Sequence, residues 1–418
     1  MDRVDLLVVG AGAAGLFAAT WAGRTAGGRL AILAVDGARK LGAKILVAGG
    51  GRCNVTHHAV DERDYAGATP PAIRKVLRRF GVADTVTFFA ERGVELKREE
   101  TGKLFPVTDR ARTVLDALVA ATTAAGVGLR HPARVDTLVR DAAGFVATTA
   151  DGPMAARRVI LCTGGRSLPK SGSDGGGLLL ARSLGHTLTE PIVPALVPLV
   201  LPADHWITSL SGVTLETEVV LRDGRGRTLA TTRGSTLCTH VGLSGPAILD
   251  MSRHWLVARA ADPAVTLALN WLPGESAEGI DRALVAAQAR GALTVLRDRL
   301  PDRLARQLCA AAGAPLSGDL GREPRRRLAG LVCGTPLPIT GDRGFAVAEA
   351  TAGGVPLPEV HLDTLESRIC PGLFFAGEVL DVDGRIGGFN FQWAWASGHV
   401  AGTAAARAAL AEGVTGGG

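Results

Sequence analysis

Stretches of apolar residues near the start of the chain predict a strand, a helix and a second strand. Residues 4–9 are continuously apolar and rich in β-branched side chains, which is typical of a strand buried in a parallel sheet. Residues 13–24 carry apolar positions at helical spacing, and residues 30–35 form another short apolar run. This order predicts the βαβ unit of an α/β fold.

The α/β pattern continues to about residue 190. Residues 40–57 are rich in glycine and show no clear periodicity, and short alternating strands are expected between residues 129 and 146. An apolar strand over residues 158–162 precedes a helix over residues 177–184. Three more helices are predicted over residues 72–80, 84–92 and 109–125, with Thr108 as the N-cap of the last.

The pattern changes near Pro191. Prolines and strand-like runs follow without helices between them, so we expect residues 191–272 to form an inserted β-barrel-like domain. Residues 273–340 show helical periodicity and predict a small helical lobe.

The first pattern returns after residue 340. A strand is predicted at residues 373–376, followed by a long alanine-rich helix at residues 391–411. We therefore expect residues 1–190 and 341–418 to form one discontinuous domain.

The bulk composition indicates a globular protein. The 418 residues are 47% hydrophobic and 21% charged, which is enough apolar material for two or three domains. In residues 4–22 the glycines have a nucleotide-binding spacing, so we expect neither a signal peptide nor a membrane segment there. The six cysteines show neither CxxC pairs nor a zinc-site spacing, so we expect reduced thiols, a cytoplasmic location and no metal.

The net charge of +6 leaves two interpretations open. Basic residues cluster at residues 74–79 and 322–327, as binding to a polyanion such as RNA would require. Runs of charge are also typical of ordinary solvated helix faces. The charge alone therefore does not decide for an RNA partner.

Residues 10–15 read GAGAAG, directly after the first predicted strand and at the start of the first helix. In this GxGxxG pattern the first glycine permits a tight turn, the second admits a pyrophosphate and the third allows close packing. An acid at the end of the second strand binds ribose hydroxyls and disfavours a 2′-phosphate, so FAD or NAD is expected. The candidate residues are Gly10, Gly12, Ala13, Ala14, Gly15 and Asp36. The alternative is a structural glycine turn with a surface aspartate.

The C-terminal segment distinguishes FAD from NAD. Residues 372–378 form a strand that ends in Gly-Glu, and residues 387–390 then open the last helix. This arrangement resembles the C-terminal motif of two-dinucleotide-binding flavoproteins. The acid can bond ribityl hydroxyls, and the positive end of the helix can stabilise a reduced flavin. The alternative is a purely structural strand–turn–helix.

Several segments resemble signatures of one bacterial flavoprotein family. They are residues 44–56 (KILVAGGGRCNVT), 163–169 (TGGRSLP), 172–175 (GSDG), 239–246 (THVGLSGP), 377–384 (GEVLDVDG) and 387–390 (GGFN). The family is usually described as NAD(P)/FAD-dependent or aminoacetone-oxidase-like oxidoreductases. Its members include assigned bile-acid ene reductases and ribosomal-RNA dihydrouridine synthases. The resemblance spans nearly the whole chain.

The resemblance implies a two-dinucleotide-binding-type Rossmann FAD domain interrupted by a β-barrel and a helical insert. It also implies a set of FAD contacts at Lys44, Gly51, Arg52, Cys53, Asn54, Val135, Thr163, Gly164, Gly377, Glu378, Gly388, Asn390 and Phe391. Three residues depart from the family pattern. Asp36 stands where Glu is common, His57 where Asn is usual, and Phe389 where Tyr is frequent.

Three residues are candidates for chemistry. Cys53 is expected near the flavin, where a thiol of depressed pKa could protonate a substrate carbon, or where a small buried residue could pack against the cofactor. Arg52 could bind the flavin phosphates or a substrate carbonyl. His240 could line the substrate cleft or serve a structural role at a strand end.

These residues together predict an FAD-dependent oxidoreductase. NAD(P)H would reduce FAD, and the reduced flavin would pass hydride to an electron-poor C=C bond such as that of uridine in ribosomal RNA. A small enone or an amine is the alternative substrate, and a non-catalytic redox sensor is the alternative class. Because the sequence has no second GxGxxG, the reductant would share the substrate cleft or be another donor. The oligomeric state stays open.

Overall fold

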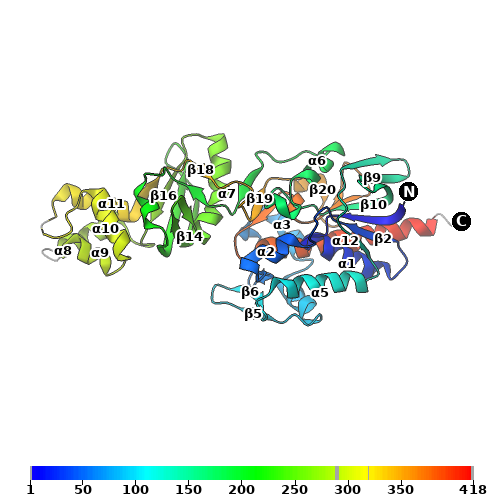
Figure 1. Cartoon of the computed structure of the whole chain (residues 1–418). Helices are drawn as coiled ribbons and strands as arrows, with labels where there is room; N and C mark the ends of the chain where they lie inside the picture. The colour runs from blue at the N-terminus through cyan, green and yellow to red at the C-terminus, as the bar shows by residue number, and fades with distance from the viewer. Residues whose placement is uncertain (1, 288–290, 319, 416–418) are drawn as a thin grey trace. The chain divides into compact units, whose positions relative to one another are not determined.

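The computed structural model describes residues 2–287, 291–318 and 320–415 and divides into two units (Figure 1). The first unit is discontinuous and comprises Met1–Ile192 and Glu349–Gly418, and the second comprises Val193–Ala348. We expected two separate inserted parts, but the inserted sheet and helices share one hydrophobic core within the second unit. Residues 288–290 and 319 of the expected helical lobe, and residues 416–418, lie outside the described residues.

A twisted sheet with a parallel centre forms the core of the first unit. The strand order is β20-β21-β22-β10-β1-β2-β7. The parallel strands are β1 (Asp2–Val9), β2 (Ile32–Val35), β7 (Gly128–Arg130), β10 (Gly152–Leu161) and β22 (Leu373–Phe375). The antiparallel additions are β8 (Thr137–Asp141), β9 (Gly144–Thr149), β20 (Val360–His361) and β21 (Glu366–Ser367). The parallel centre agrees with the continuous apolar runs in the sequence, because both faces of such a sheet are buried.

The first and last helices of the chain lie side by side in the first unit (Figure 1). These are α1 (Ala13–Ala26) and α12 (Phe389–Thr415). A Cβ added to Gly398 would lie 2.8 Å from the Ala14 carbonyl oxygen, and one on Gly402 would lie 2.2 Å from that of Ala18. Only glycine allows the two backbones to approach this closely.

The remaining elements of the first unit surround the sheet. They are α2 (Ala43–Gly51), β3 (Thr56–His57), β4 (Tyr65–Gly67), α3 (Pro70–Leu77), α4 (Val82–Ala90), β5 (Leu96–Arg98), β6 (Lys103–Pro106), α5 (Ala111–Ala124), α6 (Gly176–Ser183), β19 (Ala350–Ala352) and β23 (Val382–Gly384). Our prediction of Thr108 as a helix cap was wrong. The N-cap position of α5 is Arg110, whose side chain makes no cap hydrogen bond, and Thr108 Oγ1 lies 2.8 Å from Thr113 Oγ1.

The second unit contains a seven-stranded antiparallel sheet in the order β17-β16-β13-β14-β15-β12-β18. Its strands are β12 (Leu199–Val200), β13 (Thr214–Arg222), β14 (Thr228–Thr239), β15 (Gly242–Ser244), β16 (Thr266–Asn270), β17 (Thr335–Leu337) and β18 (Gly341–Asp342). Its helices are α7 (Pro246–Ala261), α8 (Ala277–Ala286), α9 (Ala292–Arg297), α10 (Asp302–Ala312) and α11 (Arg322–Gly334). The pairings of its described residues form an open path from β17 to β18, so we describe a sheet rather than a barrel.

Our sequence interpretation missed α7, which we had included in a strand-rich region. Its buried side includes the polar residues Asp250 and Ser252, and these interrupt the apolar periodicity. A proline at the first helical position, Pro246, was the signal that could have revealed it. No helix among the described residues is long and apolar enough to cross a membrane.

Candidate functional site

The turn at residues 10–15 connects the end of β1 to the start of α1. Gly10 has a φ of +93°, and a Cβ there would lie 2.6 Å from the Cys162 carbonyl oxygen. A Cβ on Gly15 would lie 1.8 Å from the Gly10 carbonyl oxygen, so helix and turn are in direct contact. A Cβ on Gly12 would meet no atom within 4 Å, and no side chain caps the helix there. The open side of this turn therefore fits a pyrophosphate bound by the N–H groups of the first helical turn.

Asp36 follows β2 and lies directly beside this turn. Its Oδ2 accepts a hydrogen bond from the Ala11 N–H and its Oδ1 accepts one from the Ala38 N–H, both at 2.7 Å. These two bonds fix the orientation of the carboxylate. A carboxylate offers about four acceptor positions, so it keeps capacity for ribose hydroxyls.

Lys44 and Glu378 form an ion pair that joins two predicted cofactor-binding segments. Lys44 Nζ lies 2.6 Å from Glu378 Oε2, and the side chains are 29% and 17% exposed. The other carboxylate oxygen of Glu378 accepts the Thr351 N–H at 2.7 Å. Sequence reasoning missed Thr351, which lies in no recognised motif.

Two buried hydroxyl groups near Glu378 have no hydrogen-bond partner. They are Thr163 Oγ1 and Ser173 Oγ. A Cβ on Gly164, which has a φ of +72°, would lie 2.8 Å from Ser173 Oγ and 3.8 Å from Glu378 Oε2. Buried polar groups are usually paired, so these orphaned hydroxyls fit a polar ligand such as a dinucleotide.

The segment around Cys53 is a strained turn rather than a regular helix. Helical dihedrals end at Ala48, and positive φ angles occur at Gly49, Gly50, Gly51 and Cys53. Cys53 is 0% exposed, and burial raises its pKa far above the ordinary thiol value. Burial therefore opposes the depressed pKa that the acid role requires and favours the packing role, the other alternative for Cys53. The next residue, Asn54, is 7% exposed and its Oδ1 has no partner.

Arg52 is held by protein groups on both sides. Its Nη1 lies 2.6 Å from Glu99 Oε1, and its guanidinium lies 4.0 Å from the centre of the Phe105 ring. A side chain fixed in this way has less freedom to reach a phosphate or a carbonyl. His240 belongs to the second unit, where it is exposed beside the end of β14.

The C-terminal segment returns to the turn at residues 10–15. A Cβ on Gly377 would lie 2.6 Å from the Ala14 Cβ. A Cβ on Gly388 would lie 2.6 Å from the backbone carbon of Thr56. Asn390 uses its side-chain amide to bond both backbone groups of Gly384, each at 2.9 Å. Four predicted segments, at residues 10–15, 44–56, 163–164 and 377–390, therefore converge in the first unit.

Two further predicted positions, Val135 and Phe391, also lie in the first unit. Val135 is buried between β7 and β8, and Phe391 stacks on Trp395 with ring centres 5.6 Å apart. Two of the three departures from the family pattern, His57 and Phe389, stack on each other with ring centres 5.0 Å apart. These two substitutions are therefore a contacting pair rather than independent changes.

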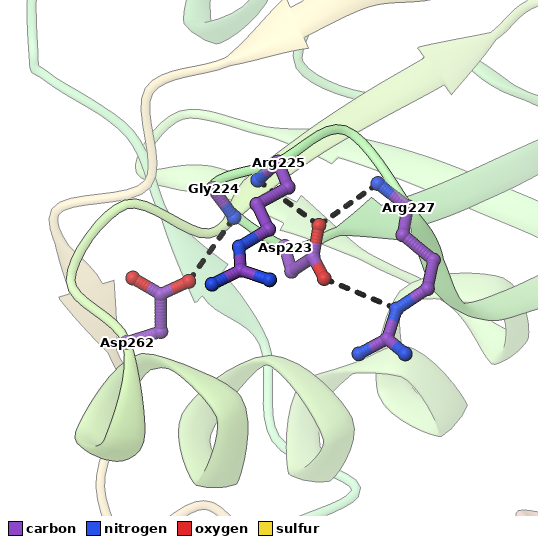
Figure 2. Close-up of a pocket in the computed structure, with 5 residues that line it drawn as sticks. All are labelled: Asp223, Gly224, Arg225, Arg227 and Asp262. Carbon is purple, nitrogen blue, oxygen red and sulfur yellow. Dashed lines mark hydrogen bonds and ion pairs between the residues drawn. The ribbon is translucent and has the colours of Figure 1, made fainter.

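In one pocket of the second unit the carboxylates are already hydrogen-bonded to neighbouring groups (Figure 2). It lies at the turn between β13 and β14 and has a volume of about 270 Å³. Asp223 accepts the N–H groups of Arg225 and Arg227, and Asp262 accepts the Gly224 N–H at 3.0 Å. These carboxylates stabilise the turn. The described residues contain no group of three or more His, Cys, Asp or Glu side chains that could hold a metal ion.

A profile described as the HI0933-like protein Rossmann domain matches residues 4–404. The chain belongs to the HI0933-like family. A 3-dehydro-bile acid delta(4,6)-reductase of Clostridium scindens is 36% identical over 97% of this chain and 99% of its own length. A ribosomal RNA dihydrouridine synthase of Escherichia coli is 32% identical over 95% of this chain and 96% of its own length.

The fold of this HI0933-like protein also resembles that of a solved structure. A mutant FrdA of Escherichia coli quinol fumarate reductase superposes with a TM-score of 0.53 and 17% identity, covering 100% of this chain and 74% of that one. This likeness concerns the fold alone. Family membership confirms our prediction of a flavin-dependent oxidoreductase with an FAD Rossmann domain.

Proposed function

We propose that this HI0933-like protein reduces a C=C bond conjugated to a carbonyl group, with FAD as hydride carrier and NAD(P)H as reductant. The observation that carries the proposal is the convergence of the 10–15 turn, the Lys44–Glu378 ion pair and the Gly377 turn in one place. The names of the two relatives support the reaction type. A bile acid with a 3-oxo group and Δ4,6 double bonds, and a uracil ring, both place the reduced bond in conjugation with a carbonyl.

The chain's own residues would bind and orient the cofactor. FAD, when bound, supplies hydride transfer. The turn at residues 10–15 would hold its pyrophosphate, Asp36 its ribose, and Glu378 its ribityl hydroxyls. Lys44 would keep Glu378 in place. Thr163 and Ser173 would offer hydroxyl groups to the same ligand.

We propose two substrates within this class. Uridine in ribosomal RNA is one, and its support is the pair of basic clusters. Several of those cations are already paired, however, since Lys75 and Arg79 both bond Asp363 and Arg325 bonds Asp281. This pairing leaves less charge for phosphates and favours the alternative, a small enone. The ion pairs within the basic clusters neither favour nor disfavour an amine as the substrate.

Anaerobic reduction of the purified holoprotein tests the proposal. We expect NADH or NADPH to bleach the flavin, and a small enone or a uridine-containing ribosomal RNA fragment to restore its colour. An amine that bleaches the flavin directly would instead indicate an oxidase. Failure of every donor and acceptor would favour a redox sensor without turnover.

Nucleoside mass spectrometry distinguishes the two substrates. Loss of dihydrouridine from ribosomal RNA in a deletion strain would identify uridine as the substrate, and unchanged RNA would favour the enone. We also propose that the enzyme works in the cytoplasm, because its six cysteines are free thiols.

A further inference from the structure

The loop of residues 166–175 lies against the end of β2. A Cβ on Gly172 would lie 3.8 Å from Asp36 Oδ1 and 3.4 Å from the Ala38 Cβ. In Rossmann folds the acid at this position binds the adenosine ribose. The loop therefore forms one side of the adenosine site proposed above.

Arg134 connects this loop to the end of β2 and the start of β8. Its Nη1 donates to Asp174 Oδ2 in an ion pair, and its Nε donates to Asp136 Oδ1 at 3.1 Å. A Cβ on Gly37 would lie 3.1 Å from the Arg134 Cβ, so the stem of the arginine packs on the backbone after β2. A Cβ on Gly176 would lie 2.8 Å from Arg134 Nη2, so the guanidinium reaches the start of α6.

Asp174 is anchored at the end of the loop. Its Oδ1 accepts the Gly176 N–H at 2.9 Å while its Oδ2 pairs with Arg134. Burial opposes its ionisation, but hydrogen bonds from Arg134 and Gly176 outweigh burial and lower its pKa. The side chains of Arg134 and Asp174 are 52% and 35% exposed, so the pair is within reach of solvent and salt.

We propose that Arg134 and Asp174 are positioning residues that hold the 166–175 loop over the adenosine half of FAD and thereby slow release of the cofactor. The inference rests on the proposed FAD site. The residue that follows Arg134 is Val135, the adenine contact implied by the family resemblance, so one side chain links the ribose end, the adenine end and the loop.

Asp174→Asn tests the proposal because it keeps an oxygen for the Gly176 N–H and removes the charge. Release of FAD from the holoenzyme is followed by the rise in flavin fluorescence after rapid dilution. We expect release about two to five times faster than from the wild type at low salt, as for a partly exposed ion pair. Added salt should accelerate release from the wild type and leave the variant almost unchanged.

Two further variants complete the experiment. Arg134→Lys keeps a positive charge and should restore part of the slow release, whereas Arg134→Gln should behave like D174N even if that variant folds poorly. Asp116→Asn is the matched control, because it removes only the exposed pair with Arg112 on α5, at 3.7 Å. Its FAD release should equal that of the wild type.

Three results would overturn the inference. Unchanged release from D174N and R134Q at low salt would show that the pair does not hold the cofactor. A lower Tm of the flavin-free D174N protein would show that the pair stabilises the fold instead. Wild-type protein that binds no FAD would refute the FAD site itself, whereas normal FAD binding with unchanged release refutes only the role of the pair.

Discussion

Two glycine-rich turns of the first unit differ in how far their glycines can be explained. In the turn at residues 10–15, Gly10 and Gly15 are required by backbone contact and Gly12 opens toward free space. In the turn at residues 49–53, three glycines and Cys53 share positive φ angles, yet Cβ atoms on Gly50 and Gly51 would have no contact closer than 3.8 Å. Gly15 of the first turn is thus required by packing, whereas Gly50 and Gly51 of the second are required by their positive φ angles.

A glycine in a motif can therefore be required by a positive φ angle or by a close neighbour, and Gly10 is required by both. The first turn follows a strand and opens a helix, so its geometry is specified by its neighbours. The second turn interrupts α2 and reverses the chain within a few residues. Its glycines report local backbone shape and do not by themselves identify a ligand.

The largest expected effect comes from Gly12→Val, which tests the open side of the first turn. A Val side chain would occupy the space needed by the pyrophosphate, so purified protein should contain almost no FAD. Release of flavin on heating, followed by chromatography, measures the occupancy. Gly330→Val is the matched control, since Gly330 is also without a neighbour within 4 Å but lies in α11. Normal FAD content in G12V would show that this turn does not bind the pyrophosphate.

A second experiment sets the two turns directly against each other. Gly15→Ala places a methyl group 1.8 Å from a carbonyl oxygen and should lower the free energy of unfolding by about 3 kcal/mol, the upper end for overpacking. Gly50→Ala meets no neighbour but must adopt a φ of +68°, at a cost of about 1 kcal/mol. Urea unfolding of the two flavin-free variants decides the ranking. Equal losses, or the reverse order, would remove the distinction between a glycine required by packing and one required by its φ angle.

Cys53→Ala should have a smaller effect, because the buried side chain favours the packing role. We expect FAD to be retained and product formation to fall by less than about tenfold, whereas loss of a general acid costs about 10²- to 10⁴-fold. Stopped-flow kinetics separates reduction of the flavin from its reoxidation by substrate. Cys309→Ala, which removes another fully buried thiol in the second unit, controls for stability alone. A loss of 10²-fold or more confined to reoxidation would restore Cys53 as the acid.

The smallest expected effect is an absence of pH dependence from Cys53. Because burial raises its pKa, the thiol stays protonated across the range from about pH 6 to pH 9, which brackets the ordinary value of about 8.5. The reoxidation rates of the wild type and of C53A should therefore change with pH in parallel. An alkaline loss of rate that appears in the wild type and disappears in C53A would contradict the raised pKa.

The sequence predicted elements well where one apolar period runs without interruption. The strands β1 and β2 and the helix α1 agree with expectation because most of their buried positions are apolar. The helix α2 was not predicted, because the glycines at residues 49–51 interrupt the apolar periodicity of this short helix. The helix α7 was not predicted because Asp250 and Ser252 are buried on it.

The candidate site was predictable only as separate segments. Asp36 and the turn at residues 10–15 are close in sequence and follow a known pattern. The pair Lys44–Glu378 is not readable in this way, because the two residues are 334 positions apart and meet only through the tertiary fold. The raised pKa of Cys53 likewise depends on burial that composition does not reveal.

The contact between α1 and α12 has a consequence for folding during synthesis on the ribosome. The helix that carries the first cofactor turn is translated long before Gly398 and Gly402, the glycines that pack against it. At about 5–20 residues per second, the 334 residues between Lys44 and Glu378 take on the order of 20–70 s to make. During that interval α1 lacks the helix that packs against it in the folded protein. We therefore expect a chain interrupted before residue 378 to lack one side of the proposed FAD site.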